Sequence, residues 1–332
     1  MNVTIRSATP GDQAGIRRVS AAALDLEPDA GALADILMAA IPAVALPGRD
    51  RFCLIAADDS VAGVCFASRG RGEAGHIDLL AVEPRARRLG IGRRLLSAAE
   101  ERLASLGAQA VLLRGNPPLH LWPGVDIRYT AMTILAERAG YQRQAEAIDM
   151  AVTLGEAAAD EVAGLYAVPS PQTVPSLDTA ADERRLAAAG ISVRRVAPAE
   201  ADGVLKWLRE GPWGASAWPD EAAAAIARDQ GGVHVAAGTA GRRTPGGCGY
   251  LGFACYGAVR PGWFGPMGTL AEARRTGIGG VLLKRCLASM RADGHSGARI
   301  GWTGPVRFYA DTVGARIERT YWIYRKEILP VR

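Results

Sequence analysis

Two stretches of this chain repeat one another at a nearly constant distance, and such a duplication constrains the fold more than any other feature of a sequence. In VTIRSATPGDQ, which begins at Val3, the residues Ile5, Arg6, Pro10 and Asp12 are answered at an offset of 188 by Val193, Arg194, Pro198 and Glu200 of SVRRVAPAEAD. PRARRLGIGRRLL at 84–96 is answered by AEARRTGIGGVLL at 271–283, and AVLLRG, which ends at Gly115, by ARIGW, which ends at Trp302; both offsets are 187. The sequence therefore predicts one domain built twice.

The chain has 332 residues, 49% of them hydrophobic, which is enough to form two separate cores. We place the first domain at 1–154 and the second at 191–332. Between them, residues 155–190 are expected to be a linker, because their centre is rich in Pro, Ser and Thr and their alanine-rich end predicts a short helix.

Within each copy the patterns predict strand, helix, strands, helix, strand, helix and strand. In the first copy, 51–58 and 61–69 have the pattern of a β-hairpin, 76–82 that of a strand, and 91–107 the helical spacing of apolar residues. These elements indicate a mixed α/β domain of roughly 150 residues in each half.

Residues 76–96 combine an apolar strand, an Arg-rich glycine loop and the start of a helix. Glycines let the main chain approach a ligand, and the first helical turn offers N–H groups that have no partner within the helix, so this arrangement favours an anion such as a pyrophosphate. The dinucleotide-binding fingerprint is excluded, because Leu95 stands where its third glycine would be, and no GxxxxGK loop is present.

Composition argues against several classes of protein. The net charge is +5, but the arginines are scattered and aromatic residues make up only 6%, which does not suit a nucleic-acid reader. Five cysteines without a CxxC pair indicate neither a disulfide framework nor a metal site, and we expect them to be reduced and buried. The sequence starts without a signal-like segment and has no apolar run of about 20 residues, so we expect a cytoplasmic protein, monomeric or homodimeric, that does not bind membranes.

Residues 82–92, VEPRARRLGIG, resemble the V-x-P-x-x-R-x-x-G-x-G stretch of the GNAT superfamily of N-acetyltransferases at every specified position. The second copy, TLAEARRTGIG at 269–279, keeps the arginine and both glycines but has Thr269 and Ala271 in place of valine and proline. The resemblance implies two tandem GNAT-fold domains, each a mixed, mostly antiparallel sheet flanked by helices. Such tandem fusions are similar to mycothiol synthase and to acetyltransferases of antibiotic gene clusters.

The resemblance also implies that acetyl-CoA is the co-substrate, with no metal. In the family, the strand before the loop holds the pantetheine arm through its main chain, and the loop holds the pyrophosphate. The corresponding residues are Leu80, Ala81 and Val82 with Arg87, Arg88, Leu89, Gly90, Ile91, Gly92 and Arg93 in the first copy, and Met267, Gly268 and Thr269 with Arg274, Arg275, Gly277, Gly279 and Gly280 in the second.

Acyl transfer needs a base for the amine and an acid for the departing thiolate. His76 stands eleven residues before Arg87, where the family places a catalytic carboxylate, and Asp78 shares its face of the strand; an ordinary surface histidine is the alternative. The family's acid is a tyrosine in L-Y-x-x-x-G-F, which suggests Tyr309 in the second copy, where a core aromatic is the alternative.

Each copy has one of these two candidate side chains and lacks the other. The second copy has Trp263 in place of the base, and the first has Ala136 in place of the tyrosine. Tyr129 begins the helix of the first copy too early to be a straightforward substitute.

The first copy carries an insertion at 117–130, whose Trp122, Asp126, Arg128 and Tyr129 either line an acceptor site or form an ordinary proline-stiffened loop. The leading hypothesis is an enzyme that acetylates the primary amine of a small metabolite. The alternatives are an acyl-CoA-binding module with degenerate catalysis and a protein N-acetyltransferase.

Overall fold

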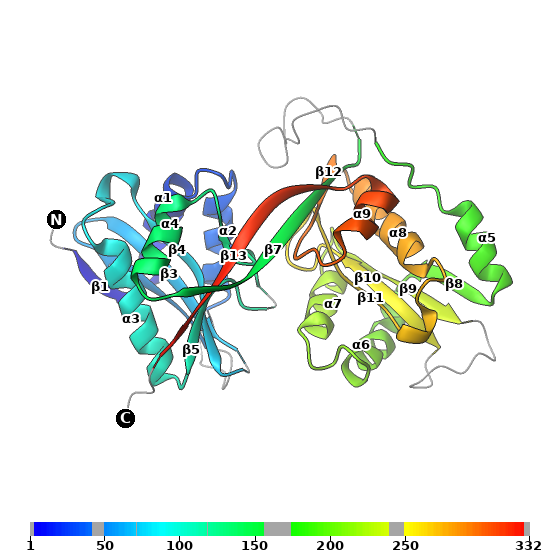
Figure 1. Ribbon diagram of the computed structural model, residues 1–332, viewed down its shortest axis with the longest axis horizontal. Coiled ribbons are helices and arrows are strands. Elements are labelled where there is room, and N and C mark those ends of the chain that lie inside the picture. Colours follow the sequence, from blue (N-terminus) through cyan, green and yellow to red (C-terminus); the bar gives the residue numbers. More distant parts are fainter. Residues whose placement is uncertain are drawn as a thin grey trace. The chain divides into compact units, whose positions relative to one another are not determined.

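The computed structural model describes residues 3–41, 50–70, 72–117, 119–155, 174–238 and 249–328. The chain folds into two compact units, which are described one at a time. Unit 1 consists of Met1–Ala147 together with Thr320–Arg332, and unit 2 of Ile148–Arg319. Figure 1 labels most of the helices and strands of both.

Unit 1 is a mixed sheet with helices packed on it. Its strands run in the order β1, β2, β3, β4, β5, β13, and every neighbouring pair is antiparallel except β4 and β5, which are parallel. The elements are β1 Thr4–Ser7, α1 Gln13–Ala23, α2 Ala30–Ala39, β2 Asp50–Ala57, β3 Val61–Arg69, β4 Ala74–Val82, α3 Ile91–Ser105, β5 Ala110–Leu113, β6 Val125–Asp126 and α4 Thr130–Arg138, with parts of β7 Gln142–Thr153 and β13 Arg316–Glu327.

Unit 2 repeats this topology. Its strands run in the order β8, β9, β10, β11, β12, β7, again with a single parallel pair, β11 and β12. The elements are α5 Ala180–Ala188, β8 Ile191–Arg195, α6 Ala201–Glu210, α7 Trp218–Ile226, β9 Gly232–Gly238, β10 Tyr250–Tyr256, β11 Trp263–Thr269, α8 Ile278–Ala292, β12 Gly297–Ile300 and α9 Val306–Val313. The predicted duplication and the mixed, mostly antiparallel fold class are confirmed.

The two repeats exchange their last strands. Met150–Thr153 of β7 pair with β12 of unit 2, whereas Tyr324–Glu327 of β13 pair with β5 of unit 1, where Figure 1 shows β13 in red. The units therefore depart from the predicted domains, because Ile148–Leu154 fold with unit 2 and the chain from Thr320 onward folds with unit 1. Composition marks a linker but carries no information on which sheet a strand will join.

The linker contains the expected short helix, α5, whereas residues 156–173, which include the first part of its Pro/Ser/Thr-rich centre, lie outside the described residues.

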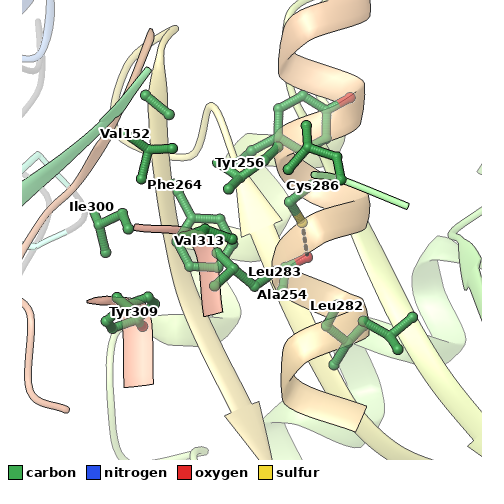
Figure 2. Packing of buried hydrophobic residues seen from close by; sticks show 14 of the residues in the cluster. Val152, Ala254, Tyr256, Phe264, Leu282, Leu283, Cys286, Ile300, Tyr309 and Val313 are labelled. Atoms are coloured by element: carbon green, nitrogen blue, oxygen red, sulfur yellow. Dashed lines mark hydrogen bonds between the residues drawn. The ribbon is translucent and has the colours of Figure 1, made fainter. Parts of the chain in front are cut away.

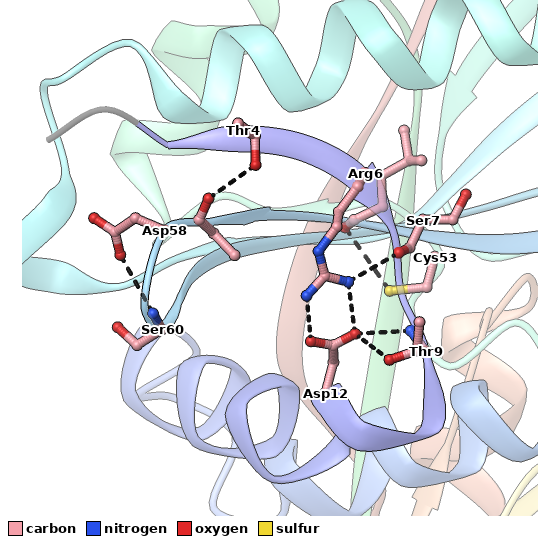
Figure 3. Close-up of polar contacts among 10 residues, drawn as sticks. Thr4, Arg6, Ser7, Thr9, Asp12, Cys53, Asp58 and Ser60 are labelled. Atoms are coloured by element: carbon pink, nitrogen blue, oxygen red, sulfur yellow. Dashed lines mark hydrogen bonds and ion pairs between the residues drawn. The ribbon is translucent and has the colours of Figure 1, made fainter.

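The first segment of the repeat is explained by an ion pair that joins the first strand to the start of the first helix. Arg6 Nη2 and Nη1 lie 2.7 and 2.8 Å from the two carboxylate oxygens of Asp12, and Asp12 also accepts hydrogen bonds from the main chain and hydroxyl of Thr9 (Figure 3). Arg6 keeps the pKa of Asp12 well below its usual value. Arg194 and Glu200 form the same pair in unit 2, so the matched residues of the repeat have one structural role.

Each unit has its own core, built around the helix that follows the glycine loop. Ile91, Leu95, Leu96, Ala99 and Leu103 of α3 are buried against the sheet of unit 1. In unit 2, α8 buries an equivalent stripe in which the Cys286 thiol lies 3.5 Å from the carbonyl oxygen of Ala254 (Figure 2). The helical spacing read from the sequence is thus the packing surface.

The cysteines follow the expectation where the structure describes them. Cys53, Cys65, Cys255 and Cys286 are buried and unpaired, and Cys248 lies outside the described residues. In the described ranges, no helix combines the length and the apolar character that a membrane span would need.

Replacing Tyr324 by alanine tests the placement of β13 in unit 1. Its ring is fully buried in the unit 1 core and its hydroxyl donates to Glu137 Oε1 at 3.1 Å. We expect Tyr324→Ala to lower the free energy of unfolding by about 3–5 kcal/mol in urea denaturation, because it leaves a cavity. Arg325→Ala on the same strand, with a partly exposed side chain, is the control and should change it by less than about 1 kcal/mol. Equal losses in both variants would contradict this placement.

Candidate active site

The glycine loops of the two units have the same main-chain shape. Arg88 and Gly90 adopt left-handed φ values of 68° and 78°, and Arg275 and Gly277 adopt 63° and 95°. Gly90 and Gly277 directly precede α3 and α8. Alternation of left- and right-handed residues before a helix makes a concave nest of N–H groups, which binds anions. The glycine loop directly before a helix that the sequence predicts is present in both copies.

In unit 1 this loop opens into a cavity of about 1090 Å³. Its wall contains Asp78 and all the residues of the first copy that the resemblance assigned to acetyl-CoA: Leu80, Ala81, Val82, Arg87, Arg88, Leu89, Gly90, Ile91, Gly92 and Arg93. A Cβ atom placed on Gly90 would meet no atom within 4 Å. The loop of unit 1 is thus accessible to a ligand.

Not every arginine of the loop is free to bind that ligand. Arg87 donates from Nη2 to the carbonyl oxygen of Ala23 at 3.1 Å and from Nε to that of Val82 at 3.4 Å. Its guanidinium joins the loop to the end of α1, while the exposed side chains of Arg88 and Arg93 stand in the cavity wall.

The cavity extends into the sheet because two neighbouring strands separate. β4 and β5 pair only from Ala74–Ala110 to Ile77–Leu113. On its other edge, β4 has a bulge: Ala67 pairs with Ile77 and Phe66 with Leu79, which leaves Asp78 unpaired. A bulge redirects the side chain of the extra residue, and here that residue is a carboxylate at the point where the strands part.

Asp78 is buried and held by two donors. The main-chain N–H of Asn116 donates to Oδ1 at 2.8 Å, and Arg51 Nη1 lies 3.4 Å from Oδ2. Burial raises the pKa of Asp78 to about 6, against the opposing effects of the Arg51 charge and of the hydrogen bonds from Ser68 and Asn116. The carboxylate form therefore predominates at neutral pH and is basic enough to accept a proton.

His76, the other candidate, is less suited to this role. It lies on β4 opposite Ser68 and Leu112, is 7% exposed, and is not among the residues that line the cavity. Burial and the positive charges of Arg114 and Arg51 lower its pKa to about 3. A group of such low basicity is a poor proton acceptor, and the geometry favours Asp78.

The insertion at 117–130 forms part of the cavity wall. Trp122, Asp126, Arg128 and Tyr129 all line it. Hydrogen bonds join this segment to the loop after α1: the Leu26 N–H donates to the Tyr129 hydroxyl at 3.1 Å, and Trp122 Nε1 to Glu27 Oε1 at 3.2 Å. These contacts support the interpretation of the insertion as part of an acceptor site. The loop after α1 belongs to the same wall, although no sequence pattern indicates this.

In unit 1, alanine stands at the position of the family's catalytic tyrosine. Ala136 is fully buried there. Tyr129 begins its helix seven residues earlier, which corresponds to about 10 Å along a helix axis. Burial also raises the pKa of its hydroxyl to about 12. Tyr129 therefore lines the cavity without occupying the position of the family's tyrosine.

In unit 2 the equivalent surfaces are covered by the unit's own side chains. A Cβ atom placed on Gly268, the counterpart of Ala81, would lie 2.6 Å from the indole ring of Trp213. That ring is packed at 5.1 to 6.0 Å from Phe253, Trp207 and Trp218. On Gly277, the added atom would lie 2.5 Å from Arg185 Nη2 of α5.

The remaining loop residues of unit 2 hold its structure together. Arg274 Nε donates to the carbonyl oxygen of Thr269 at 3.4 Å, as Arg87 does to Val82. Met267 packs against the core, Gly279 and Gly280 face Phe308 and Thr312 of α9, and Arg275 supplies the left-handed turn. These residues reproduce the loop, although Trp213 and Arg185 lie over it.

The residues of unit 2 at the predicted catalytic positions offer neither a carboxylate base nor an exposed acid. The register between β10 and β11 shifts where β4 has its bulge, but Gly265 stands in the position of Asp78. Tyr309 is 6% exposed, with its ring centroid 5.0 Å from that of Phe308 and 6.1 Å from that of Phe264 (Figure 2). Burial raises its pKa to about 12, and it is a core aromatic rather than an exposed acid.

The described parts of the chain bring together no group of three or more His, Cys, Asp or Glu side chains that could hold a metal ion.

Comparison with known proteins agrees with this geometry. Residues 25–120, which include β4, the glycine loop, α3 and β5, match the family model of the acetyltransferase (GNAT) family. Members of this family transfer acyl groups from acetyl-CoA. No protein with a curated description matches the sequence.

Solved structures with the same fold cover nearly all of the chain. A tandem GNAT protein from the clavulanic acid biosynthesis pathway aligns over 100% of both chains at 14% identity, with a TM-score of 0.67. A GCN5-related N-acetyltransferase from Sphaerobacter thermophilus aligns over 99% of this chain and 96% of its own at 19% identity, with a TM-score of 0.66.

A third structure is a GCN5-related glucosamine N-acetyltransferase region of a fungal multi-domain GH3 β-N-acetylglucosaminidase. It has a TM-score of 0.73 at 14% identity, and the alignment covers 98% of this chain but only 38% of that larger protein. At these identities the three structures establish the fold. Residues 25–120 of unit 1 thus match the acetyltransferase (GNAT) family model, and the chain has, over its length, the fold of tandem GNAT proteins.

Proposed function

We propose that unit 1 transfers an acetyl group from acetyl-CoA to the primary amine of a small metabolite, and that unit 2 supports it without binding acetyl-CoA. One observation carries the proposal: a single cavity joins the open glycine loop to a buried carboxylate at the parting of β4 and β5. The loop fits a pyrophosphate through its N–H groups, helix dipole and exposed Arg88 and Arg93.

The chemistry assigned to the chain's own residues is proton transfer and orientation. The amine nitrogen attacks the thioester carbonyl carbon, the C–S bond breaks, and Asp78 takes the proton that the nitrogen loses. Since no side chain among the described residues of unit 1 takes the place of the family's tyrosine at Ala136, the departing sulfur takes its proton from water. Holding the two reactants together in the cavity supplies much of the rate.

The dimensions of the cavity support a small acceptor over a protein. A volume of about 1090 Å³ is slightly above the roughly 300–1,000 Å³ of small-molecule sites, as expected for a site that takes both acetyl-CoA and a second molecule. The acceptor end is walled by the insertion and the loop after α1, which are hydrogen-bonded to each other.

Matched substitutions in the two loops test which unit binds acetyl-CoA. Aspartate tolerates the left-handed conformation, and Gly90→Asp places its carboxylate where the pyrophosphate would lie. We expect wild-type protein to bind one acetyl-CoA per chain in isothermal titration calorimetry, and Gly90→Asp to weaken binding by between about tenfold and a thousandfold through like-charge repulsion.

Gly90→Asn is the uncharged control and should weaken binding much less. Gly277→Asp, the same change in unit 2, should leave the affinity unchanged. Two molecules bound per chain, or equal losses from both aspartate variants, would refute the assignment to unit 1.

Replacing each base candidate separately tests the chemistry. With a panel of small primary amines and detection of free thiol, we expect Asp78→Asn to lower kcat by about 10²–10⁴-fold, the usual contribution of a general base. His76→Gln should retain most of the activity, since its imidazole is not in the cavity wall. Thiol release that no amine stimulates would favour the acyl-CoA-binding alternative.

Stability measurements separate loss of a base from loss of folding. Asp78 has a folded pKa of about 6, above its unfolded value of about 3.9, so the folded state is destabilised as pH rises from about 4 to 6. Asp78→Asn removes this penalty and should be more stable than wild type by about 2–3 kcal/mol at pH 7.5. The gain should vanish near pH 4; a gain that persists there would contradict the raised pKa.

A further inference from the structure

Arg51 connects three segments around Asp78. It lies in β2, and its guanidinium Nη2 donates to the main-chain carbonyl oxygen of Asn116 at 2.6 Å, while Nη1 lies 3.4 Å from Asp78 Oδ2. Its side chain is 13% exposed and that of Asp78 is 3% exposed. A guanidinium in such a site is always charged and holds two acceptors in a fixed geometry.

Asn116 closes the arrangement. Its N–H donates to Asp78 Oδ1 at 2.8 Å, and its carbonyl oxygen accepts from Arg51. Asn116 and Arg51 thus contact different oxygens of Asp78 and are hydrogen-bonded to each other. Asp78 and Asn116 follow the last paired residues of β4 and β5, Ile77 and Leu113. The three residues Arg51, Asp78 and Asn116 therefore meet where the cavity enters the sheet.

We propose that Arg51 is a positioning residue for the acetyl transfer, which fixes the rotamer of Asp78 and keeps its carboxylate ionised for the amine proton. The inference rests on the function proposed above. It goes beyond it, because neither the glycine-loop motif nor the position of the base candidates on β4 points to an arginine in β2.

Among the described groups that act on the pKa of Asp78, Arg51 supplies the positive charge, while hydrogen bonds from Ser68 and from the main chain of Asn116 lower that pKa as well. Ser68 and Cys65 face it from β3, His76 from its own strand, and the N–H of Asn116 from beyond β5. The buried Cys65 thiol has a pKa raised well above its usual value and His76 one of about 3, so both are uncharged near neutral pH. Arg114, directly after β5, contributes to the charge around His76.

The test compares Arg51→Met, which removes the charge and keeps the length of the side chain, with Arg51→Lys, which keeps the charge. The carboxyl ¹³C resonance of Asp78 is assigned by its loss in Asp78→Asn and titrated in each variant. An opposite charge within about 4–6 Å lowers a carboxyl pKa by about 1–3 units. We expect Arg51→Met to raise the midpoint by that amount, from near 6, and Arg51→Lys to raise it by less than one unit.

The pH dependence of kcat/KM is the second measurement. Its acid limb should move upward with the NMR midpoint in Arg51→Met, while the affinity for acetyl-CoA, which also reports folding, stays within about threefold of wild type. An unchanged NMR midpoint in Arg51→Met overturns the proposal for Arg51. An NMR midpoint that moves while the kinetic limb does not overturns the basic role of Asp78 instead, so the two failures are distinguishable.

Discussion

The parting of β4 and β5 is the constraint on which the site of unit 1 depends. Two parallel strands that stay paired would bury their main-chain groups in a ladder, and this sheet would have no cavity. Here the pairing ends at Ile77 and Leu113, and the bulge at Asp78 turns a carboxylate toward the opening. The strands can separate because new partners satisfy the main chain beyond that point: Asn116 bonds to Asp78 and Arg51. The insertion after β5 then lines the space that the separated strands leave.

The two units show how few changes separate an open site from a closed one. Their loops have the same left-handed residues and their sheets the same order. At the offset of 188, Trp213 stands where unit 1 has Asp25, a residue of the cavity wall. Its ring lies on Gly268, where unit 1 has Ala81. A retained glycine loop is therefore evidence of shared ancestry and of main-chain shape, whereas accessibility depends on side chains far from it in the sequence.

The features that could be predicted from the sequence are those encoded by residues close together in the chain or by the repeat itself. Glycines before a helix fix a loop, apolar spacing fixes the buried face of α3, and the repeat fixes the duplication; all three are confirmed. Two kinds of feature could not be predicted. Asp78 could not be preferred to His76, because alternation places both on one face and only the bulge and burial distinguish them. Arg51 and the loop after α1 approach the site through tertiary contacts between segments far apart in the chain, which leave no pattern in either segment.

The exchange of β7 and β13 between the repeats affects how the protein is made. Unit 1 receives one of its sheet strands from residues that are translated after the whole of Ile148–Arg319. At about 5–20 residues per second, synthesis of that stretch takes roughly 10–35 s. During this interval the emerging first half presents β5 with an unfilled edge, a surface prone to wrong pairing. The half that carries the cavity thus begins to form first and is completed last, so ribosome pausing within unit 2 prolongs the vulnerable state of unit 1.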